Sequence, residues 1–288
     1  MFIDIHGHAY RKHCPFPNAF VTPEKLLAIY DEIGIERACV LPLVSPEVYL
    51  PQSNDDIIEM AQKWPDRYIA FCNVDPRALT NSVNAPLGDL FRYYRDLGVK
   101  GIGEFMPNLP FLDPLVQNLF KHAQDVGFPL IFDICDRVGT NYGLIDEPGL
   151  PQLEITLRRF PKLIIFGHGP AFWAEMGVLE TPADRVAYPN YPIRSEGVVP
   201  KLLRRYPNLV GDLSATSGCN ALARDPAHAV GFLKEFQDKL YFGTDICVES
   251  QRSPLATFLL KLKAEGKITE TVFNKIAREN AIKLLGLK

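Results

Sequence analysis

The chain has 288 residues, of which 47% are hydrophobic and 23% charged, and its formal net charge is −3. This length suits one large α/β domain, since a single barrel takes ~250 residues, and the slightly acidic balance argues against a nucleic-acid backbone as partner. No apolar run approaches the ~20 residues of a membrane span. The six scattered cysteines and the lack of a secretory leader predict reduced thiols in a cytoplasmic protein.

Short runs rich in β-branched and aromatic residues recur along the chain. Most follow one another at about 30 to 35 residues, the size of one strand–helix unit. We expect strands at residues 1–5, 37–43, 68–74, 99–105, 129–134, 163–167, 209–213 and 240–243.

Segments with helical periodicity lie between these runs. The first begins at Thr22-Pro23, an N-cap residue followed by proline at the first helical position. The others are expected at residues 54–63, 83–97, 114–126, 150–160, 198–206, 221–236 and 253–264, with one or two further helices at 269–287. Eight strands, each followed by a helix, predict a (β/α)₈ TIM barrel that forms a single domain. An open doubly wound sheet is the alternative, but no glycine-rich phosphate turn follows the first strand.

The longest irregular insertion spans residues 170–194, after the sixth expected strand, and is rich in Pro, Tyr and Trp. Loops at the C-terminal face of a barrel carry its chemistry, so we expect this one to act as a lid or a substrate wall. Trp173 and Tyr188 are its candidate pocket residues, and packing within the loop is the alternative for both.

Polar side chains of ligand or proton-transfer type stand at the ends of the expected strands. His6 and His8 end the first strand, and residues two apart in a strand point to the same face. Two imidazoles on one edge, with carboxylates from other strands, can hold a divalent metal. The remaining strand-end groups are Glu104, Asp133, His168, Asp212 and Asp245. Because active sites of barrels form where strands end, we expect these groups to converge.

Four segments carry a resemblance to a known family: Ile3-Asp-Ile-His-Gly-His8, Gly167-His-Gly169, Gly243-Thr-Asp245 and Asn280-Ala-Ile-Lys-Leu-Leu-Gly286. Together they resemble the amidohydrolase superfamily. The nearest group is the amidohydrolase-related branch, which contains the aminocarboxymuconate-semialdehyde and resorcylate decarboxylases. The resemblance covers nearly the whole chain. It implies a (β/α)₈ barrel with one or two divalent ions, zinc being the first expectation and manganese or magnesium the alternatives.

The resemblance also implies roles for individual residues. His6 and His8 match the metal ligands of the first strand. His168 matches a residue that orients or deprotonates the attacking water in mononuclear members and binds the second metal in binuclear ones. Asp245 matches the last-strand ligand that takes a proton from water.

Two positions depart from the branch or go beyond it. The fifth-strand ligand is usually histidine, whereas the sequence has Asp133, an oxygen donor that favours harder ions such as Mn²⁺ or Mg²⁺. Glu104, in Gly101-Ile-Gly-Glu104, is similar to a residue that bridges two metals in TatD-like nucleases. Pairing with a nearby Arg or Lys is the alternative for Glu104.

Candidate substrate-binding residues lie near the strand ends. We expect contacts from Arg11, Arg137 and Tyr142, since a guanidinium suits a carboxylate on a small substrate. Further candidates of the same kind are Lys12, His13, Arg185 and Arg194. Solvated surface charge is the alternative for each cation. Asp212, Ser214 and Ser217 could cap the next helix, and Asp212 could instead contact substrate or a histidine of the site.

Three functions follow from these residues. The first is a metal-dependent hydrolase of a small amide, ester or lactone, in which the ion lowers the pKa of a bound water toward ~7. The second is a non-oxidative decarboxylase on the same barrel. The third is a catalytically silent relative that binds a metal or ligand, suggested by Asp133. We expect a small-molecule substrate that could carry a carboxylate, and a homodimer is left open.

Overall fold

The computed structural model describes residues 1–11, 20–48, 52–137, 139 and 142–288, so Lys12 and His13 lie outside the described residues. Its main strands run parallel in a three-stranded and a five-stranded sheet. The first sheet contains β1 (Phe2–Gly7), β2 (Ile35–Val40) and β3 (Tyr68–Ala70). The second contains β4 (Ile102–Phe105), β5 (Leu130–Phe132), β8 (Ile165–Gly167), β9 (Leu209–Asp212) and β10 (Leu240–Tyr241).

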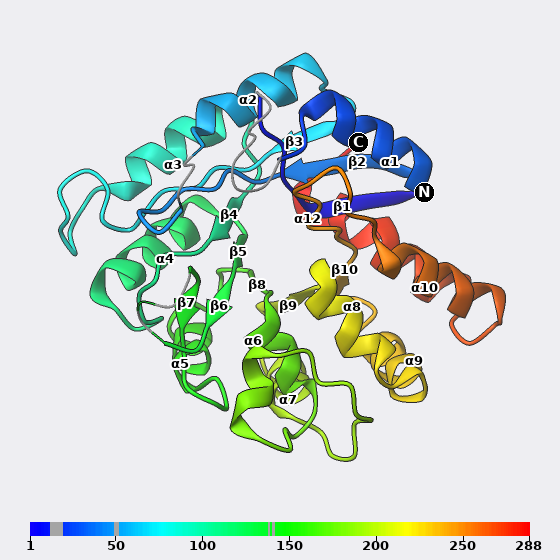
Figure 1. Ribbon diagram of the computed structural model, residues 1–288. Helices are drawn as coiled ribbons and strands as arrows, with labels where there is room; N and C mark the ends of the chain where they lie inside the picture. The colour runs from blue at the N-terminus through cyan, green and yellow to red at the C-terminus, as the bar shows by residue number, and fades with distance from the viewer. Residues whose placement is uncertain (12–19, 49–51, 138, 140–141) are drawn as a thin grey trace.

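Two contacts join the sheets into a closed barrel. A parallel bridge between Cys72 and Ile102 links β3 to β4, and a bridge between Gly7 and Ile246 links β1 to the segment after β10. The expected (β/α)₈ barrel is confirmed, and each expected strand region contributes one of its strands (Figure 1).

Helices cover the outside of the barrel (Figure 1). They are α1 (Pro23–Ile33), α2 (Asn54–Lys63), α3 (Leu87–Asp96), α4 (Pro114–Val126), α5 (Pro151–Arg159), α7 (Val198–Arg205), α8 (Ala215–Ala223), α9 (Pro226–Glu235) and α10 (Pro254–Ala264). The single helix expected over 221–236 is wrong. The chain breaks before Pro226, which disfavours helical backbone at the preceding residue, and Asp225 caps the new helix by accepting from the His228 amide.

The C-terminal segment closes the end of the barrel opposite the polar strand-end groups. It runs through α11 (Glu270–Asn274), the π-helical η3 (Lys275–Glu279) and α12 (Asn280–Leu285). Ala281 and Leu285 of α12 join the interior cluster. The strands contribute Ile3, Ile5, Cys39, Leu41, Ile69, Phe71, Ile131, Phe166, Val210 and Tyr241 to this cluster. Apolar side chains fill the interior, so the polar strand-end groups gather at the other end.

The long insertion is fixed by a buried ion pair rather than left open. It contains α6 (Pro170–Trp173), η1 (Ala174–Met176) and η2 (Pro182–Val186). Arg185 donates from Nε to Glu175 (2.6 Å) and from Nη1 to the Asp146 carbonyl (2.8 Å). The Arg185 guanidinium, expected to meet substrate, therefore holds the loop in place.

Two short strands follow β5 in the sequence and pair with each other: β6 (Ile134–Cys135) and β7 (Leu144–Ile145).

Within the described residues, no helix combines the length and the apolarity needed to cross a membrane.

Candidate metal centre

β1 carries His6, and His8 follows its last residue; a register shift in the strand decides where these two expected ligands point. Ile5 lies in the barrel interior, whereas the Asp4 carboxylate accepts a hydrogen bond from the Tyr30 hydroxyl of α1 (2.8 Å). The pairing of β1 with β2 shifts register between Asp4 and the end of the strand. Beyond the shift, His6 and His8 turn together toward the mouth of the barrel, as residues two apart are expected to do.

Four donor atoms face one point at this mouth. His6 Nε2 and His8 Nε2 are 3.1 Å apart. Asp245 Oδ1 lies 3.2 Å from His8 Nε2 and 3.6 Å from His6 Nε2, and Glu104 Oε2 lies 3.4 and 3.6 Å from the same atoms. Donors ~2.1 Å from one tetrahedral ion stand about 3.4 Å apart. These separations therefore fit a divalent cation.

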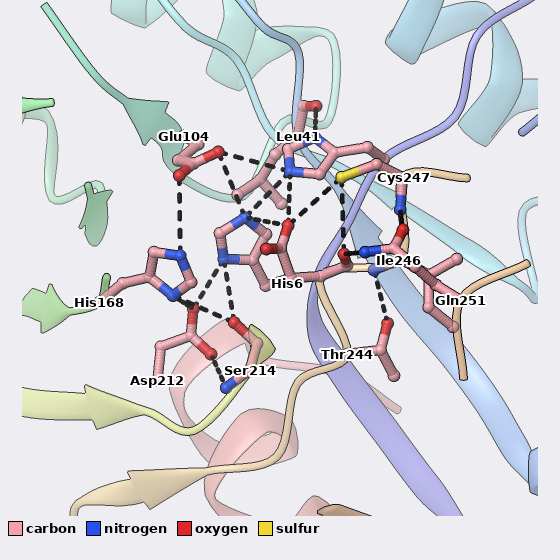
Figure 2. A network of polar contacts seen from close by, with 12 residues as sticks. His6, Leu41, Glu104, His168, Asp212, Ser214, Thr244, Ile246, Cys247 and Gln251 are labelled. Carbon is pink, nitrogen blue, oxygen red and sulfur yellow. Dashed lines mark hydrogen bonds and ion pairs between the residues drawn. The ribbon is translucent and has the colours of Figure 1, made fainter. Parts of the chain in front are cut away.

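A second donor set shares Glu104. Its other oxygen, Oε1, lies 3.7 Å from His168 Nε2, and Asp133 supplies a third group within 4.8 Å of both. The Asp133 carboxylate also accepts a hydrogen bond from the Ile134 amide (2.7 Å), which interrupts the strand expected over 129–134. Glu104 thus belongs to both donor sets, with Oε2 facing His6 and His8 and Oε1 facing His168 (Figure 2).

Asp212 lies behind the two donor sets and orients their imidazoles. Its Oδ2 accepts from His6 Nδ1 (2.7 Å) and His168 Nδ1 (3.1 Å), as Figure 2 shows. Ser214 lies 3.1 Å from His168 Nδ1 through Oγ, and its amide donates to Asp212 Oδ1 (2.9 Å). Since each Nδ1 is engaged, each Nε2 is left to face the centre. The serine starts α8 without a side-chain capping bond.

The cluster is electrostatically built to hold positive charge. Burial lowers the pKa of His8, but hydrogen bonds to Asp245 and Glu104 outweigh it and raise that pKa to about 9. Burial raises the pKa of Glu104, but hydrogen bonds from His6 and His8 hold it well below its usual range. Burial and the nearby Glu104 charge raise the pKa of Asp133 to about 7. Protons on the histidines therefore balance the carboxylates where no metal does so.

A cavity of about 530 Å³ opens onto the donor sets. Asp245 is the accessible member, with 22% of its side chain exposed against 8% for Glu104. Its backbone adopts a left-handed φ of 54°, which an aspartate tolerates. The other lining residues are His8, Phe20, Leu43, Glu47, Val48, Glu104, Met106, Asp133, Tyr142, His168, Pro170, Tyr188, Ala215, Ser217, Cys247, Val248 and Gln251.

A model of the amidohydrolase family matches residues 3–287. The chain belongs to the amidohydrolase family. This confirms the resemblance carried by the sequence motifs, and the superfamily is metal-dependent, in agreement with the candidate donor sets. A comparison with curated proteins finds no match.

Solved structures similar to this amidohydrolase share its fold at low sequence identity. A probable 2-pyrone-4,6-dicarboxylic acid hydrolase from Acinetobacter baumannii has 14% identity over 99% of each chain, with a TM-score of 0.59. A 2,6-dihydroxybenzoate decarboxylase from Rhizobium has 16% identity over 99% of this chain and 98% of its own, at 0.58. A 5-carboxyvanillate decarboxylase from Novosphingobium aromaticivorans, complexed with manganese, has 17% identity over 93% and 81%, at 0.58. A probable hydrolase and two decarboxylases therefore share this barrel.

The structure separates the candidate substrate residues of the amidohydrolase. Tyr142 and Tyr188 line the cavity. Arg11 instead pairs with Asp56 (3.1 Å) and Glu59 on α2, so it is tied to the barrel surface. Two other guanidinium groups, those of Arg137 and Arg194, are not among the lining residues, and the Arg194 side chain is 81% exposed. Trp173 is buried and donates from Nε1 to the Asp212 carbonyl (2.8 Å).

Several cavity residues of the amidohydrolase were not found from the sequence. Leu43, Met106 and Phe20 form an apolar cluster at one side of the cavity. Leu43 and Met106 follow the ends of β2 and β4, so the strand-end rule that found the acids could have found them too. Phe20 is brought in by a bridge to Val248, which no local pattern signals.

Proposed function

We propose that this amidohydrolase is a divalent-metal-dependent hydrolase of a small amide, ester or lactone. The observation that carries the proposal is the pair of donor sets that share Glu104 beneath one cavity. His6, His8 and Asp245 with Glu104 Oε2 would hold one ion, and His168 and Asp133 with Glu104 Oε1 would hold the second. The set with two histidines suits zinc, whereas the set with one histidine and two carboxylates suits manganese or magnesium as well.

When bound, an ion would supply Lewis-acid polarisation of a carbonyl oxygen and would lower the pKa of a water molecule. Asp245 lines the cavity and is more exposed than Glu104, so it would accept the proton of the attacking water and pass it to the leaving group. His168, held through Nδ1 by Asp212, presents Nε2 to the same cavity and would orient the water or the scissile carbonyl. Tyr142, Tyr188 and the apolar cluster would enclose the rest of the substrate.

Turnover with a substrate panel tests the proposal. The panel contains aryl esters, γ-lactones and 2-pyrone-4,6-dicarboxylate, assayed with zinc or manganese in water enriched in ¹⁸O. We expect metal-dependent turnover with one water oxygen in the product, and its loss in Asp245→Asn. Asp136→Asn, a change at an exposed carboxylate that does not line the cavity, serves as the matched control and should keep full activity. Unchanged turnover in Asp245→Asn would show that Asp245 is not the proton acceptor.

A decarboxylase is the second candidate. It is favoured by the barrel that this chain shares with the 2,6-dihydroxybenzoate and 5-carboxyvanillate decarboxylases. In that reaction the ion and His168 would bind the substrate's carboxylate and neighbouring oxygen, with no attack by water. Incubation with 2,6-dihydroxybenzoate and 5-carboxyvanillate should then release CO₂ without incorporation of water oxygen into the aromatic product. Hydrolysis of the first panel with no CO₂ from the second would reject it.

A further inference from the structure

A second cleft lies at the end of the barrel opposite the candidate metal centre. It is a cavity of about 250 Å³ bounded by α2, the first half of β2, β3, the segment before β4 and the C-terminal end of the chain. Its apolar wall consists of Ile58, Ala61, Ile69, Leu97 and Leu287. The metal centre contributes none of its lining residues, so any ligand here is separate from the substrate.

The charges on this cleft are all positive among its described lining residues. Arg37 and Lys100 line it, and no Asp or Glu does. The Arg37 Nε atom is fully buried and has no hydrogen-bond partner in the described part of the chain. The neighbouring Glu36 pairs through Oε1 with Arg278 (3.1 Å), while its Oε2 is buried without a partner in the described residues, and Glu36 does not line the cleft. The cleft thus presents two cations and no carboxylate among its described lining residues.

A guanidinium loses more than a neutral group when its donors are unmatched. Arg37 lines the cleft, and a carboxylate is the anion that suits the part of its guanidinium facing the cleft, because the planar fork matches a carboxylate in parallel hydrogen bonds. The exposed Lys100 adds a second positive charge that an anion would share. The apolar wall favours an organic ligand, because a bare inorganic ion would leave this wall exposed to water.

We propose that this cleft binds a small organic carboxylate. Its carboxylate meets Arg37 and Lys100, and its hydrocarbon body lies against the wall formed by α2, β3 and Leu287. The site is a binding site only, with no group in it that suggests chemistry. A ligand bound there would lie on the face of the barrel away from the candidate metal centre.

Calorimetric titration with three probes at constant ionic strength tests the ligand class. Benzoate has the required charge and apolar body, benzamide has the same shape without charge, and inorganic phosphate has charge without the apolar body. We expect saturable benzoate binding, with benzamide and phosphate each at least about tenfold weaker, the loss that one charged hydrogen bond represents. Benzamide binding as tightly as benzoate would overturn the role of the cations. Phosphate binding more tightly would overturn the organic class.

Variants locate the benzoate. Arg37→Gln and, independently, the surface change Lys100→Gln should each weaken binding, whereas Lys121→Gln, an exposed lysine of α4, should not. Asp245→Asn separates this site from the metal centre, and benzoate affinity should survive that change whatever the enzyme's reaction proves to be. Affinity that is unchanged in both Arg37→Gln and Lys100→Gln, or lost in Asp245→Asn, would refute the proposal.

Discussion

Asp212 shows how a residue can shape a metal site without facing the ion. One of its oxygens accepts hydrogen bonds from the Nδ1 atoms of His6 and His168. A carboxylate in this position selects the tautomer that points Nε2 at the metal and makes that nitrogen a better donor.

Replacing Asp212 with asparagine should therefore weaken metal binding by about 10- to 100-fold while the fold is kept. The amide can still fill the space, but it carries no charge, and when its oxygen takes the place of Oδ2 its NH₂ group faces the Ser214 amide, which is also a donor. Competition with a chromophoric chelator measures the affinity. Ser217→Ala, a change at a cavity residue that touches neither imidazole in the described contacts, is the control. Equal affinities in the two variants would contradict the role given to Asp212.

Proton competition gives a second expectation at the scale of residues. The pKa of His8 is raised to about 9 by hydrogen bonds to Asp245 and Glu104 that outweigh its burial. Below this pH the imidazole carries a proton that an ion must displace. Metal affinity should therefore fall by about tenfold per pH unit, for each proton displaced, as the pH drops from 9 to 6. An affinity that is flat over this range would mean that His8 is not a ligand.

The convergence of His6, His8 and Asp245 could be predicted from the sequence because a strand end fixes where a side chain starts. The position of Arg11 could not. It lies three residues beyond His8, and two acids of α2, distant in sequence, decide its direction. Arg185 is similar, since its partners Glu175 and Asp146 come from separate loops.

At the scale of elements, strands and helices follow from periodicity, but their interruptions do not. β1 alternates as a strand should until its register shift lets Ile5 and His6 both lie on the inner side. β5 ends where the Asp133 carboxylate accepts a hydrogen bond from the next backbone amide, that of Ile134. The break at Pro226, by contrast, is readable, because an Asp-Pro pair inside a helical pattern signals a new N-terminus. The interruptions lie beside the site, where regular pairing gives way to side-chain placement.

Gly167, at the end of β8, tests how closely these elements approach one another. A Cβ at this position would lie 2.2 Å from the ring of Phe172, which is fully buried and cannot move aside. Gly167→Ala should cost about 1–3 kcal/mol in the free energy of unfolding, measured by urea denaturation. Gly231→Ala is the matched control, because α9 leaves open space there and alanine should stabilise the helix. Similar effects of the two changes would contradict this packing.

At the scale of the whole molecule, the barrel brings carboxylates from four strand ends into one buried cluster. These are Glu104, Asp133, Asp212 and Asp245. Their mutual repulsion makes the folded state a cation-binding state, so a bound ion should stabilise the protein. This convergence follows from barrel closure, and the sequence predicted it once eight strand–helix units were recognised.

Removal of metal should accordingly lower the thermal stability. Free ion at about 100 times its Kd adds about 2.7 kcal/mol to the free energy of unfolding. Scanning calorimetry before and after dialysis against a chelator should therefore show a lower Tm, restored by zinc or manganese. Sodium at the same ionic strength gives the control for screening. A Tm that chelation does not change would show that the cluster of carboxylates does not bind a metal.

The most direct test of the central claim is elemental analysis of protein purified without added metal or chelator. The shared Glu104 predicts about two equivalents of divalent ion per chain, with one or none in Glu104→Gln and loss on changing His6 and His8 to alanine. Protein that is free of metal, and that takes up neither zinc nor manganese when they are offered, would contradict the account.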